Sequence, residues 1–309
     1  MLLASVVIPT HNQQHILEYC LQILFNQTAS PDTYELVIVD DGSNDGTSEM
    51  VQKLQEKAPC PLIYNWHPNI GRSLNRNTGA LMAHGKYLIF LDGDMLVRRE
   101  FVSAHLSAHT KPGLIAHGPV VYTEELKDPD NGQKKVYDFS RAFFATGNVS
   151  LEREQFIASG MFDADFIEYG WEDLELGERL RKMGLQTVRC PEAWSYHLQK
   201  RLTYEGIPGL IAKEKERGHM GVLFYRKNPS IAVQLMTLIS PIYFAYDRIL
   251  TICHWPEKPG TLKLLQHLDR PGTRFLFRLL VEIVKSHAYA DGLREALARE
   301  GKSGNSNPR

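Results

Sequence analysis

The chain has 309 residues, of which 43% are hydrophobic and 23% are charged, and its formal net charge is -1. This length supports one large domain or two modest ones, and the balanced charge argues against a nucleic-acid-binding protein that relies on a global positive field. The four cysteines lie far apart without a CxxC pair, so we expect neither a zinc site nor a disulfide framework, and a reducing cytoplasm fits this usage.

Strand-like and helix-like segments alternate along the first third of the chain. Short runs rich in β-branched and aromatic residues predict strands at residues 4–9, 35–39, 62–65 and 86–92. Apolar residues at helical spacing predict helices at residues 14–26, 46–57 and 72–84. This order predicts an α/β fold with a mostly parallel central sheet flanked by helices. The apolar start lacks a basic leader, so we interpret it as the first strand and not as a signal peptide.

Polar residues follow each predicted strand, where open parallel sheets bind their ligands. After the apolar run LIFL, Asp92 and Asp94 stand on either side of Gly93. In an extended chain both carboxylates point to the same side, and glycine lets the backbone approach a ligand closely. Paired carboxylates favour Mg²⁺ or Mn²⁺, whose open positions suit a diphosphate; a turn with solvated acids is the alternative for this short motif alone. The absence of GxGxxG and GxxxxGKS disfavours a nicotinamide-dinucleotide fold and a P-loop.

A second acidic segment, GWEDLELGERL, predicts an amphipathic helix that begins near Trp171. Its apolar face contains Leu176, Leu180 and Met183. Its first turn contains three acids: Glu172, Asp173 and Glu175. The helix dipole favours acids at this position, so capping alone could explain them.

Several stretches resemble family 2 glycosyltransferases with the GT-A fold. The nucleotide-binding half of that family is similar, in order and spacing, to SVVIPTHN, VIVDDGSNDGT, NIGRSLNRNTGA and LIFLDGDM. The acceptor half, with a galactosyltransferase-type carboxy-terminal segment, is similar to TGNVSLERE, GMFDADFIEYGWEDLELGERLRKMG and Tyr196-His197. The resemblance covers residues 4 to about 198. It implies a nucleotide-sugar-binding half at 1–120 and an acceptor-binding half at 121–225. The composition beyond residue 225 predicts a helical extension at 226–300 and a disordered tail at 301–309.

Carried over by position, the resemblance implies a nucleotide pocket at the ends of the first strands. Asp41 would accept a hydrogen bond from a ring N–H of the nucleobase, and Thr10 and the backbone around Pro9 would line the same pocket. Arg72 and Arg76 are both candidates for contacts with the nucleotide or its phosphates, because a guanidinium fork suits phosphate oxygens.

The same resemblance implies a divalent cation, Mn²⁺ or Mg²⁺, at the aspartate pair. Asp94 matches the direct metal ligand of the family. Asp92, which we also count with the metal site, would lie nearer the ribose or a metal-bound water, and Gly93 would lie beside the nucleotide sugar. His197 matches a histidine that completes the metal shell in related enzymes, although a single histidine is more often a surface or packed residue.

For the acidic helix, the resemblance implies that Asp173 is the general base and that Glu172 binds or orients the acceptor. An inverting transfer needs one base, on the side opposite the leaving nucleoside diphosphate, to take a proton from the attacking hydroxyl. Retaining relatives with the same surrounding pattern tend to have Asn at the position of Asp173, so this residue favours inversion.

Together these features predict a metal-dependent, inverting glycosyltransferase (EC 2.4) that moves a hexosyl or N-acetylhexosaminyl group from a nucleoside-diphosphate sugar to an acceptor hydroxyl. UDP-sugars are the commonest donors in the family. The sequence does not distinguish among saccharide, lipid-linked and peptide acceptors. We expect a role in polysaccharide or glycoconjugate synthesis. Two other classes compete with this prediction: a non-catalytic nucleotide-sugar-binding scaffold, and a sugar nucleotidyltransferase, whose glycine-rich amino-terminal activation loop we do not find.

The last third of the chain is less specific. Glycines and basic residues at 199–221 predict either a loop that closes over the diphosphate or an ordinary solvated loop and helix. Residues 229–246 are uncharged, but Gln234 and Pro241 favour a buried or interfacial helix over a membrane span. With the amphipathic segment 273–288, this stretch could place residues 229–285 on the inner face of the cell membrane, cover the core or form a homodimer contact.

Overall fold

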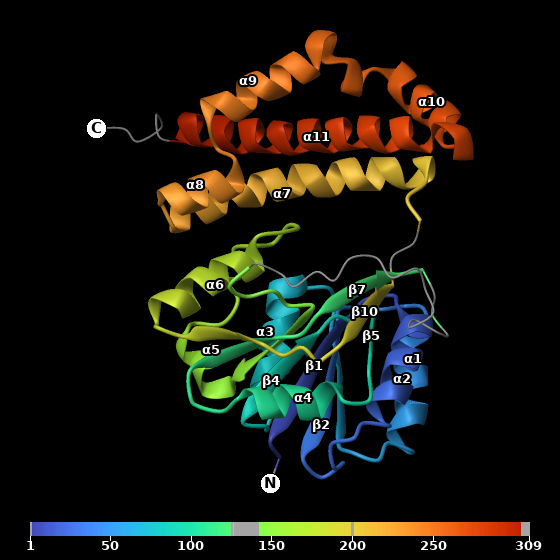
Figure 1. The fold of residues 1–309 in the computed structure, drawn as a ribbon, viewed down its shortest axis with the longest axis vertical. Coiled ribbons are helices and arrows are strands. Elements are labelled where there is room, and N and C mark those ends of the chain that lie inside the picture. The colour runs from blue at the N-terminus through green and yellow to red at the C-terminus, as the bar shows by residue number, and fades with distance from the viewer. Residues whose placement is uncertain (1, 125, 127–141, 199–200, 304–309) are drawn as a thin grey trace. The chain divides into compact units, whose positions relative to one another are not determined.

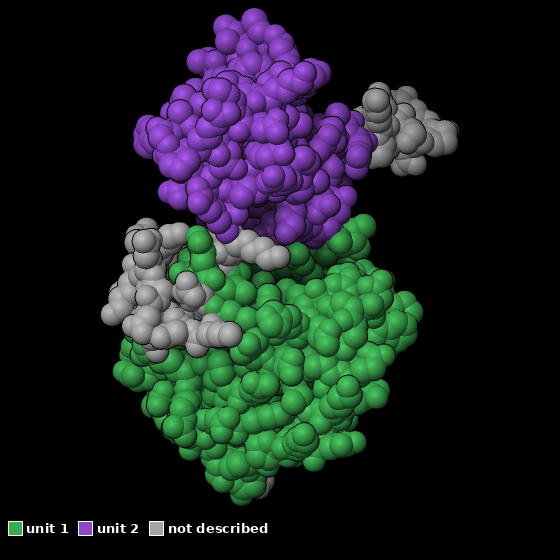
Figure 2. Space-filling model, turned by 90° about the vertical axis from the view of Figure 1, so that its right-hand side faces the viewer, with its two compact units in different colours: residues 1–167, 172–200 green, residues 168–171, 201–309 purple. Residues whose placement is uncertain are grey.

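The structure is a computed structural model that describes residues 2–124, 126, 142–198 and 201–303 (Figure 1). The chain divides into two compact units, which Figure 2 shows in different colours. Unit 1 comprises residues 1–167 and 172–200, and unit 2 comprises residues 168–171 and 201–309. The boundary at residue 200 falls inside the segment that the sequence assigns to the acceptor-binding half.

Unit 1 is built around a mixed sheet in which seven strands of the described chain follow the order β3-β2-β1-β4-β8-β6-β9. They are β1 (Ala4–Thr10), β2 (Tyr34–Asp40), β3 (Leu62–Trp66), β4 (Tyr87–Leu91), β6 (Leu114–His117), β8 (Asn148–Glu152) and β9 (Gln186–Arg189). β1 to β4 run parallel, as do β6 and β9, whereas β8 pairs antiparallel with β4 and β6. The predicted α/β fold with a mostly parallel sheet is confirmed, and β8 is an addition.

Helices cover both faces of this sheet (Figure 1). On one face lie α1 (Gln14–Leu24), α2 (Thr47–Gln55) and α4 (Phe101–Ala108); on the other lie α3 (Arg72–Met82), α5 (Arg153–Ala158) and α6 (Glu172–Lys182). Alternate residues of β1 supply the two cores, because Val6 and Ile8 belong to the first and Val7 to the second. Because both faces of the sheet are buried, the strand sequences are apolar at successive positions.

A second, three-stranded sheet of the described residues has the order β5-β10-β7. Its strands are β5 (Met95–Val97), β10 (Ser195–Leu198) and β7 (Val120–Thr123). β10 runs antiparallel to β5, with His197 opposite Met95. This register places His197 beside the residue that precedes Met95, which is Asp94.

Unit 2 is helical. Its elements are η1 (Tyr204–Gly206), α7 (Ile207–Lys227), α8 (Ile231–Thr237), α9 (Pro241–Leu250), η2 (Ile252–Glu257), α10 (Pro259–Leu268), η3 (Pro271–Thr273) and α11 (Arg274–Ser303). The long helices α7 and α11 lie side by side (Figure 1). Their backbones approach closely because Gly218 has no side chain: a Cβ there would lie 2.4 Å from the carbonyl oxygen of Tyr289.

The structure corrects several details of the sequence analysis. Residues 204–221 of the segment 199–221 are helical, which agrees with the loop-and-helix alternative and not with a closing loop. Gly218 is a packing position against α11, and residues 199 and 200 lie outside the described chain. Met183 follows the end of α6 and is exposed, so it does not share the buried face of Leu176 and Leu180. Residues 301–303 continue α11, and 304–309 lie outside the described residues.

The uncharged stretch 229–246 forms two short helices. α8 and α9 each begin after a serine N-cap, Ser230 and Ser240, whose side-chain oxygen accepts a backbone N–H of the following turn. Leu238 ends α8 in a left-handed conformation. Within the described part of the chain, no helix is both long and apolar enough to cross a membrane.

Candidate active site

The ends of β1 and β2 form the first part of the site. Asp41 directly follows β2, and its buried carboxylate accepts backbone N–H groups of Ile70 at 2.7 Å and Gly71 at 3.2 Å, immediately before α3. The neighbouring Asp40 accepts the hydroxyl of Tyr64 at 2.7 Å. Asp41 therefore fixes the loop after β3, and Asp40 ties the end of β2 to β3, at the same edge of the sheet.

Thr10 and Pro9 lie at the end of β1, next to the Asp-Gly-Asp turn. The Oγ1 atom of Thr10 is buried and has no hydrogen-bond partner among the described residues. A Cβ at Gly93 would lie 2.7 Å from the carbonyl oxygen of Pro9. The glycine is thus required because the turn packs against β1, a reason that the sequence alone did not reveal.

Asp94, directly before β5, and His197, in β10, bring two potential metal-ligand atoms together. His197 Nε2 lies 3.2 Å from Asp94 Oδ2, and both side chains remain about one-third exposed. Burial raises the pKa of Asp94, but the hydrogen bond and charge of His197, with a contribution from Arg72, outweigh it and lower that pKa below its usual value. The same hydrogen bond raises the pKa of His197 despite its burial.

This pair fits a divalent cation of the kind that the family resemblance implies. Adjacent ligands of an octahedral ion with bonds of about 2.1 Å lie roughly 3 Å apart, close to the separation of the Asp94 and His197 donor atoms. The Oδ1 atom of Asp92 accepts a hydrogen bond from Arg76 at 2.7 Å. The structure therefore brings Asp94 and His197 together and engages Asp92 with an arginine.

Arg76 lies between the two acidic motifs. Its guanidinium donates to Asp92 at 2.7 Å and to Glu172 at 3.4 Å, although these carboxylates are far apart in the sequence. The ring of Phe162 lies 5.8 Å from the guanidinium carbon. Burial lowers the pKa of Arg76, but Asp92 and Glu172 more than compensate and raise it, so the side chain is always a cation. Of the two candidate arginines, Arg76 is buried and Arg72 is exposed.

The first turn of α6 carries the second acidic motif. Glu172 is buried, and its Oε2 atom has no hydrogen-bond partner among the described residues. Glu175 instead pairs with Arg179 at 2.6 Å within the same helix, which accounts for it structurally. Burial and the charge of Glu172 raise the pKa of Asp173 to about 7, against the opposing effect of Arg76. A carboxyl group with such a pKa can exchange a proton near neutral pH.

Two aromatic residues near the site were missed by the sequence analysis. Phe162 packs against Arg76, and the ring of Tyr122 lies 5.4 Å from the ring of His197. Phe162 belongs to a segment that carries the family resemblance but was not singled out, whereas Tyr122 comes from a segment without a ligand signal and reaches His197 only through the pairing of β7 with β10.

The mixed sheet flanked by helices has the fold of a GT-A glycosyltransferase. It carries an Asp-x-Asp turn with a histidine beside it and an acidic helix joined to it by an arginine. The chain belongs to glycosyl transferase family 2, whose family model matches residues 5–164. A second model, described as the N-terminal domain of galactosyltransferase, matches residues 131–204.

Several known proteins resemble the chain. Validoxylamine A glucosyltransferase of Streptomyces hygroscopicus subsp. limoneus is 28% identical over 275 residues, which cover 77% of this chain and 59% of the relative. Chondroitin synthase of Escherichia coli is 26% identical over 348 residues, covering 88% and 50%. The chain thus spans less than two thirds of the length of these relatives.

Among solved structures, the fold is similar to mannosyltransferase PcManGT from Pyrobaculum calidifontis in complex with GDP-Man and Mn²⁺. The TM-score is 0.60 at 18% sequence identity, and the match covers 95% of this chain and 86% of that chain. The predicted family and fold are both confirmed.

Proposed function

We propose that this glycosyltransferase is a metal-dependent, inverting enzyme that transfers a hexosyl or N-acetylhexosaminyl group from a nucleoside-diphosphate sugar to an acceptor hydroxyl. The observation that carries the proposal is the Arg76 bridge, which joins the Asp-x-Asp turn at Asp92 to the acidic helix at Glu172. A donor-binding motif and a base-bearing motif held by one guanidinium suit a direct transfer, whereas a scaffold would need no such connection.

The donor nucleotide would bind where β1 and β2 end. The unpaired hydroxyl of buried Thr10 and the backbone at Pro9 offer polar contacts there, beside Asp41. The Asp41 carboxylate already accepts hydrogen bonds from two backbone N–H groups, so a nucleobase N–H would donate to a carboxylate that also holds the loop before α3. Exposed Arg72 is the better candidate for the phosphates, because Arg76 is buried between carboxylates. We propose a UDP-sugar as donor, as the family resemblance suggests.

Asp94 and His197 would hold the cation, with Asp92 close by. When bound, a divalent cation would stabilise the negative charge that develops on the leaving diphosphate. The imidazole nitrogen of His197 favours Mn²⁺ over Mg²⁺, which strongly prefers oxygen ligands.

Asp173 would act as the general base. Its raised pKa matches a group that must accept a proton from a hydroxyl near neutral pH. The hydroxyl oxygen then attacks the anomeric carbon, the bond to the diphosphate oxygen breaks, and the proton is held by Asp173. Glu172 has one free oxygen to accept a hydrogen bond from the acceptor while Arg76 fixes the other. A single displacement of this kind inverts the anomeric configuration.

Nucleoside-diphosphate release from a panel of UDP-, GDP- and dTDP-sugars tests this proposal. We expect slow hydrolysis of one donor with Mn²⁺, its loss with excess chelator, and faster release when a suitable acceptor is added. Metal-dependent nucleotide binding without release across donors and acceptors would favour a scaffold. Exchange of pyrophosphate into a sugar nucleotide would favour a nucleotidyltransferase.

We also propose that unit 2 contacts an anionic membrane surface, where a lipid-linked acceptor would be available. Large apolar side chains are exposed along α8 to α11, including Ile242 at 82% and Phe275 at 83%. The exposed basic residues of residues 229–279 are Arg248, Lys258, Lys263, Arg270 and Arg278. Apolar and basic side chains together suit an interfacial surface.

Vesicle sedimentation tests this contact. We expect binding to phosphatidylglycerol vesicles, little binding to phosphatidylcholine vesicles, and loss of binding when Ile242 and Phe275 are both replaced by Ser. A stable dimer in solution that does not sediment with vesicles would instead assign this surface to a second copy of the chain.

A further inference from the structure

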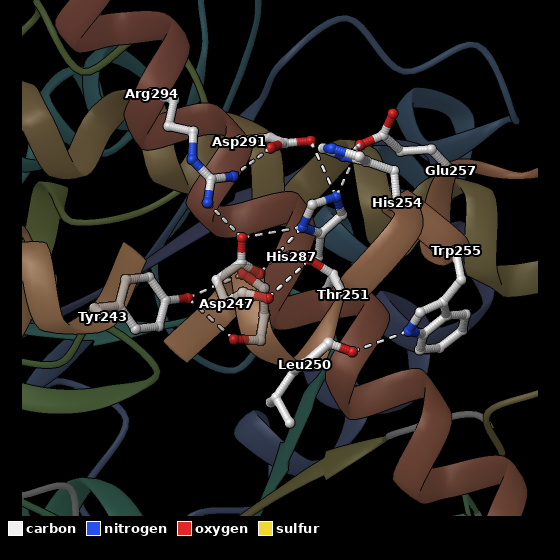
Figure 3. Close-up of polar contacts among 11 residues, drawn as sticks. Tyr243, Asp247, Leu250, Thr251, His254, Trp255, Glu257, His287, Asp291 and Arg294 are labelled. Carbon is white, nitrogen blue, oxygen red and sulfur yellow. Dashed lines mark hydrogen bonds and ion pairs between the residues drawn. The ribbon is translucent and has the colours of Figure 1, made fainter. Parts of the chain in front are cut away.

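A cluster of histidines and carboxylates lies in unit 2, remote in sequence from the residues of the proposed transfer site. It joins the turn η2, through His254 and Glu257, to helix α11, through His287 and Asp291 (Figure 3). One ligand-type atom from each of His254, Glu257 and His287 lies within 4.8 Å of the other two. Neither the sequence motifs nor the glycosyltransferase chemistry uses these residues.

The distances within this cluster suit a small cation. Glu257 Oε1 lies 3.0 Å from His287 Nε2 and 3.2 Å from His254 Nδ1, and Asp291 Oδ2 lies 3.6 Å from His287 Nε2. Four ligands bound tetrahedrally at about 2.05 Å are roughly 3.3 Å apart. The Glu257 oxygen is therefore spaced from both histidine nitrogens as neighbouring ligands of one tetrahedral ion would be, and Asp291 lies somewhat farther from His287.

The surroundings of His287 fix which of its nitrogens faces the cluster. Buried Asp247 lies 3.0 Å from His287 Nδ1, which donates its hydrogen to this carboxylate, so Nε2 is the nitrogen that faces Glu257. An ion bound there would replace the proton that Nε2 donates to Glu257. Arg294 in turn pairs with Asp247 and with the other oxygen of Asp291 (Figure 3). A carboxylate that orients a histidine in this way is typical of metal-binding histidines.

The exposure of the cluster allows a metal ion to enter. His287 and Asp247 are buried, whereas the side chains of His254 and Glu257 are 74% and 55% exposed. Buried His287, oriented by Asp247 of α9, would provide a preformed ligand on α11. The exposed pair would close over the ion from η2, which lies between α9 and α10.

We propose that His254, Glu257 and His287, with Asp291 beside them, bind a divalent transition-metal ion, zinc by preference, and that this ion ties η2 to α11. Two imidazoles and one carboxylate form a nitrogen and oxygen ligand set that zinc accepts, with the fourth tetrahedral position left to water or to Asp291. The cysteine count alone predicts no zinc site, and this one uses no cysteine. The opposing interpretation is a network of hydrogen bonds and ion pairs in which protons hold the same groups together.

Metal titration of the full chain separates the two interpretations. The protein is stripped with a chelator, and Zn²⁺ or Co²⁺ is added to wild type, to His254→Gln and to the control His267→Gln. His267 is an exposed histidine on α10 outside the cluster. Both substitutions are at exposed positions, so neither should impair folding.

We expect wild type and the control to retain one more equivalent of Zn²⁺ than His254→Gln, and to be stabilised against thermal unfolding by Zn²⁺. With Co²⁺ they should show the strong visible absorption of a four-coordinate ion, absent from His254→Gln. The pair Asp94 and His197 is intact in all three proteins and contributes equally. Equal zinc content and equal cobalt spectra in wild type and His254→Gln would overturn the proposal, as would a melting temperature that Zn²⁺ leaves unchanged.

Discussion

Replacement of Arg76 by Met tests whether one guanidinium holds the two acidic motifs together. The side chain is 6% exposed and contacts Asp92 at 2.7 Å and Glu172 at 3.4 Å. Each attraction is worth about 4 kcal/mol at a charge separation near 4 Å and an effective dielectric constant of about 20, before desolvation is subtracted. Asp92 is 34% exposed and is partly screened by water, so the well-buried Glu172 loses more when the cation is removed.

From these contacts we expect Arg76→Met to lower the free energy of unfolding by about 3 to 5 kcal/mol, the usual cost of removing one partner of a buried ion pair. With a urea dependence near 2 kcal/mol per molar, the midpoint should fall by about 2 M. Tryptophan fluorescence reports this transition through Trp66 and Trp194 of unit 1, with a constant contribution expected from Trp171 and Trp255 of unit 2.

The same substitution should alter the pH dependence of transfer. Arg76 lowers the pKa of Asp173, so its removal should raise that pKa and move the acidic limb of the rate profile to higher pH. Arg76→Lys is the matched control: it keeps the charge, so the limb should stay near that of wild type, while stability falls less. A loss of stability below about 1 kcal/mol in Arg76→Met, together with an unchanged pH profile, would refute the bridge.

Three further predictions concern single residues. Asp173→Asn should cut transfer by about 10² to 10⁴-fold with donor affinity retained. Folding raises the pKa of Asp173 from 3.8 to about 7, so ionisation of this carboxyl destabilises the folded wild type as pH rises through this range. The variant should therefore be more stable than wild type at pH 8 but not at pH 3. His197→Ala should raise the Mn²⁺ concentration for half-maximal activity by at least about tenfold, and an unchanged value would remove His197 from the metal site. Gly218→Ala should destabilise unit 2 by about 1 to 3 kcal/mol through overpacking against α11, whereas Gly209→Ala, whose Cβ would meet nothing within 4 Å, should leave thermal stability equal or slightly raised.

Local patterns predicted the framework of unit 1 well. The strands and helices up to β4 lie within a few residues of their predicted bounds, because alternating burial in strands and helical spacing in amphipathic segments are properties of short stretches. The Asp-Gly-Asp turn and the acidic start of α6 were likewise visible as motifs, and the family that they suggested is confirmed. The segment 199–221 was harder, because glycine marks both hinges and close helix contacts, and only packing against Tyr289 distinguishes these uses at Gly218.

The sequence by itself therefore determined the α/β class, the family and the chemical types gathered at the strand ends. Only the tertiary structure decided which of these groups meet: His197 reaches Asp94 through the pairing of β10 with β5, and Arg76 reaches both Asp92 and Glu172 from α3. The same holds for His254 and His287, which are joined only when η2 folds against α11. The physical reason is that periodicity and capping act over a few residues, whereas an ion pair or a ligand set depends on distances between segments that no local pattern encodes.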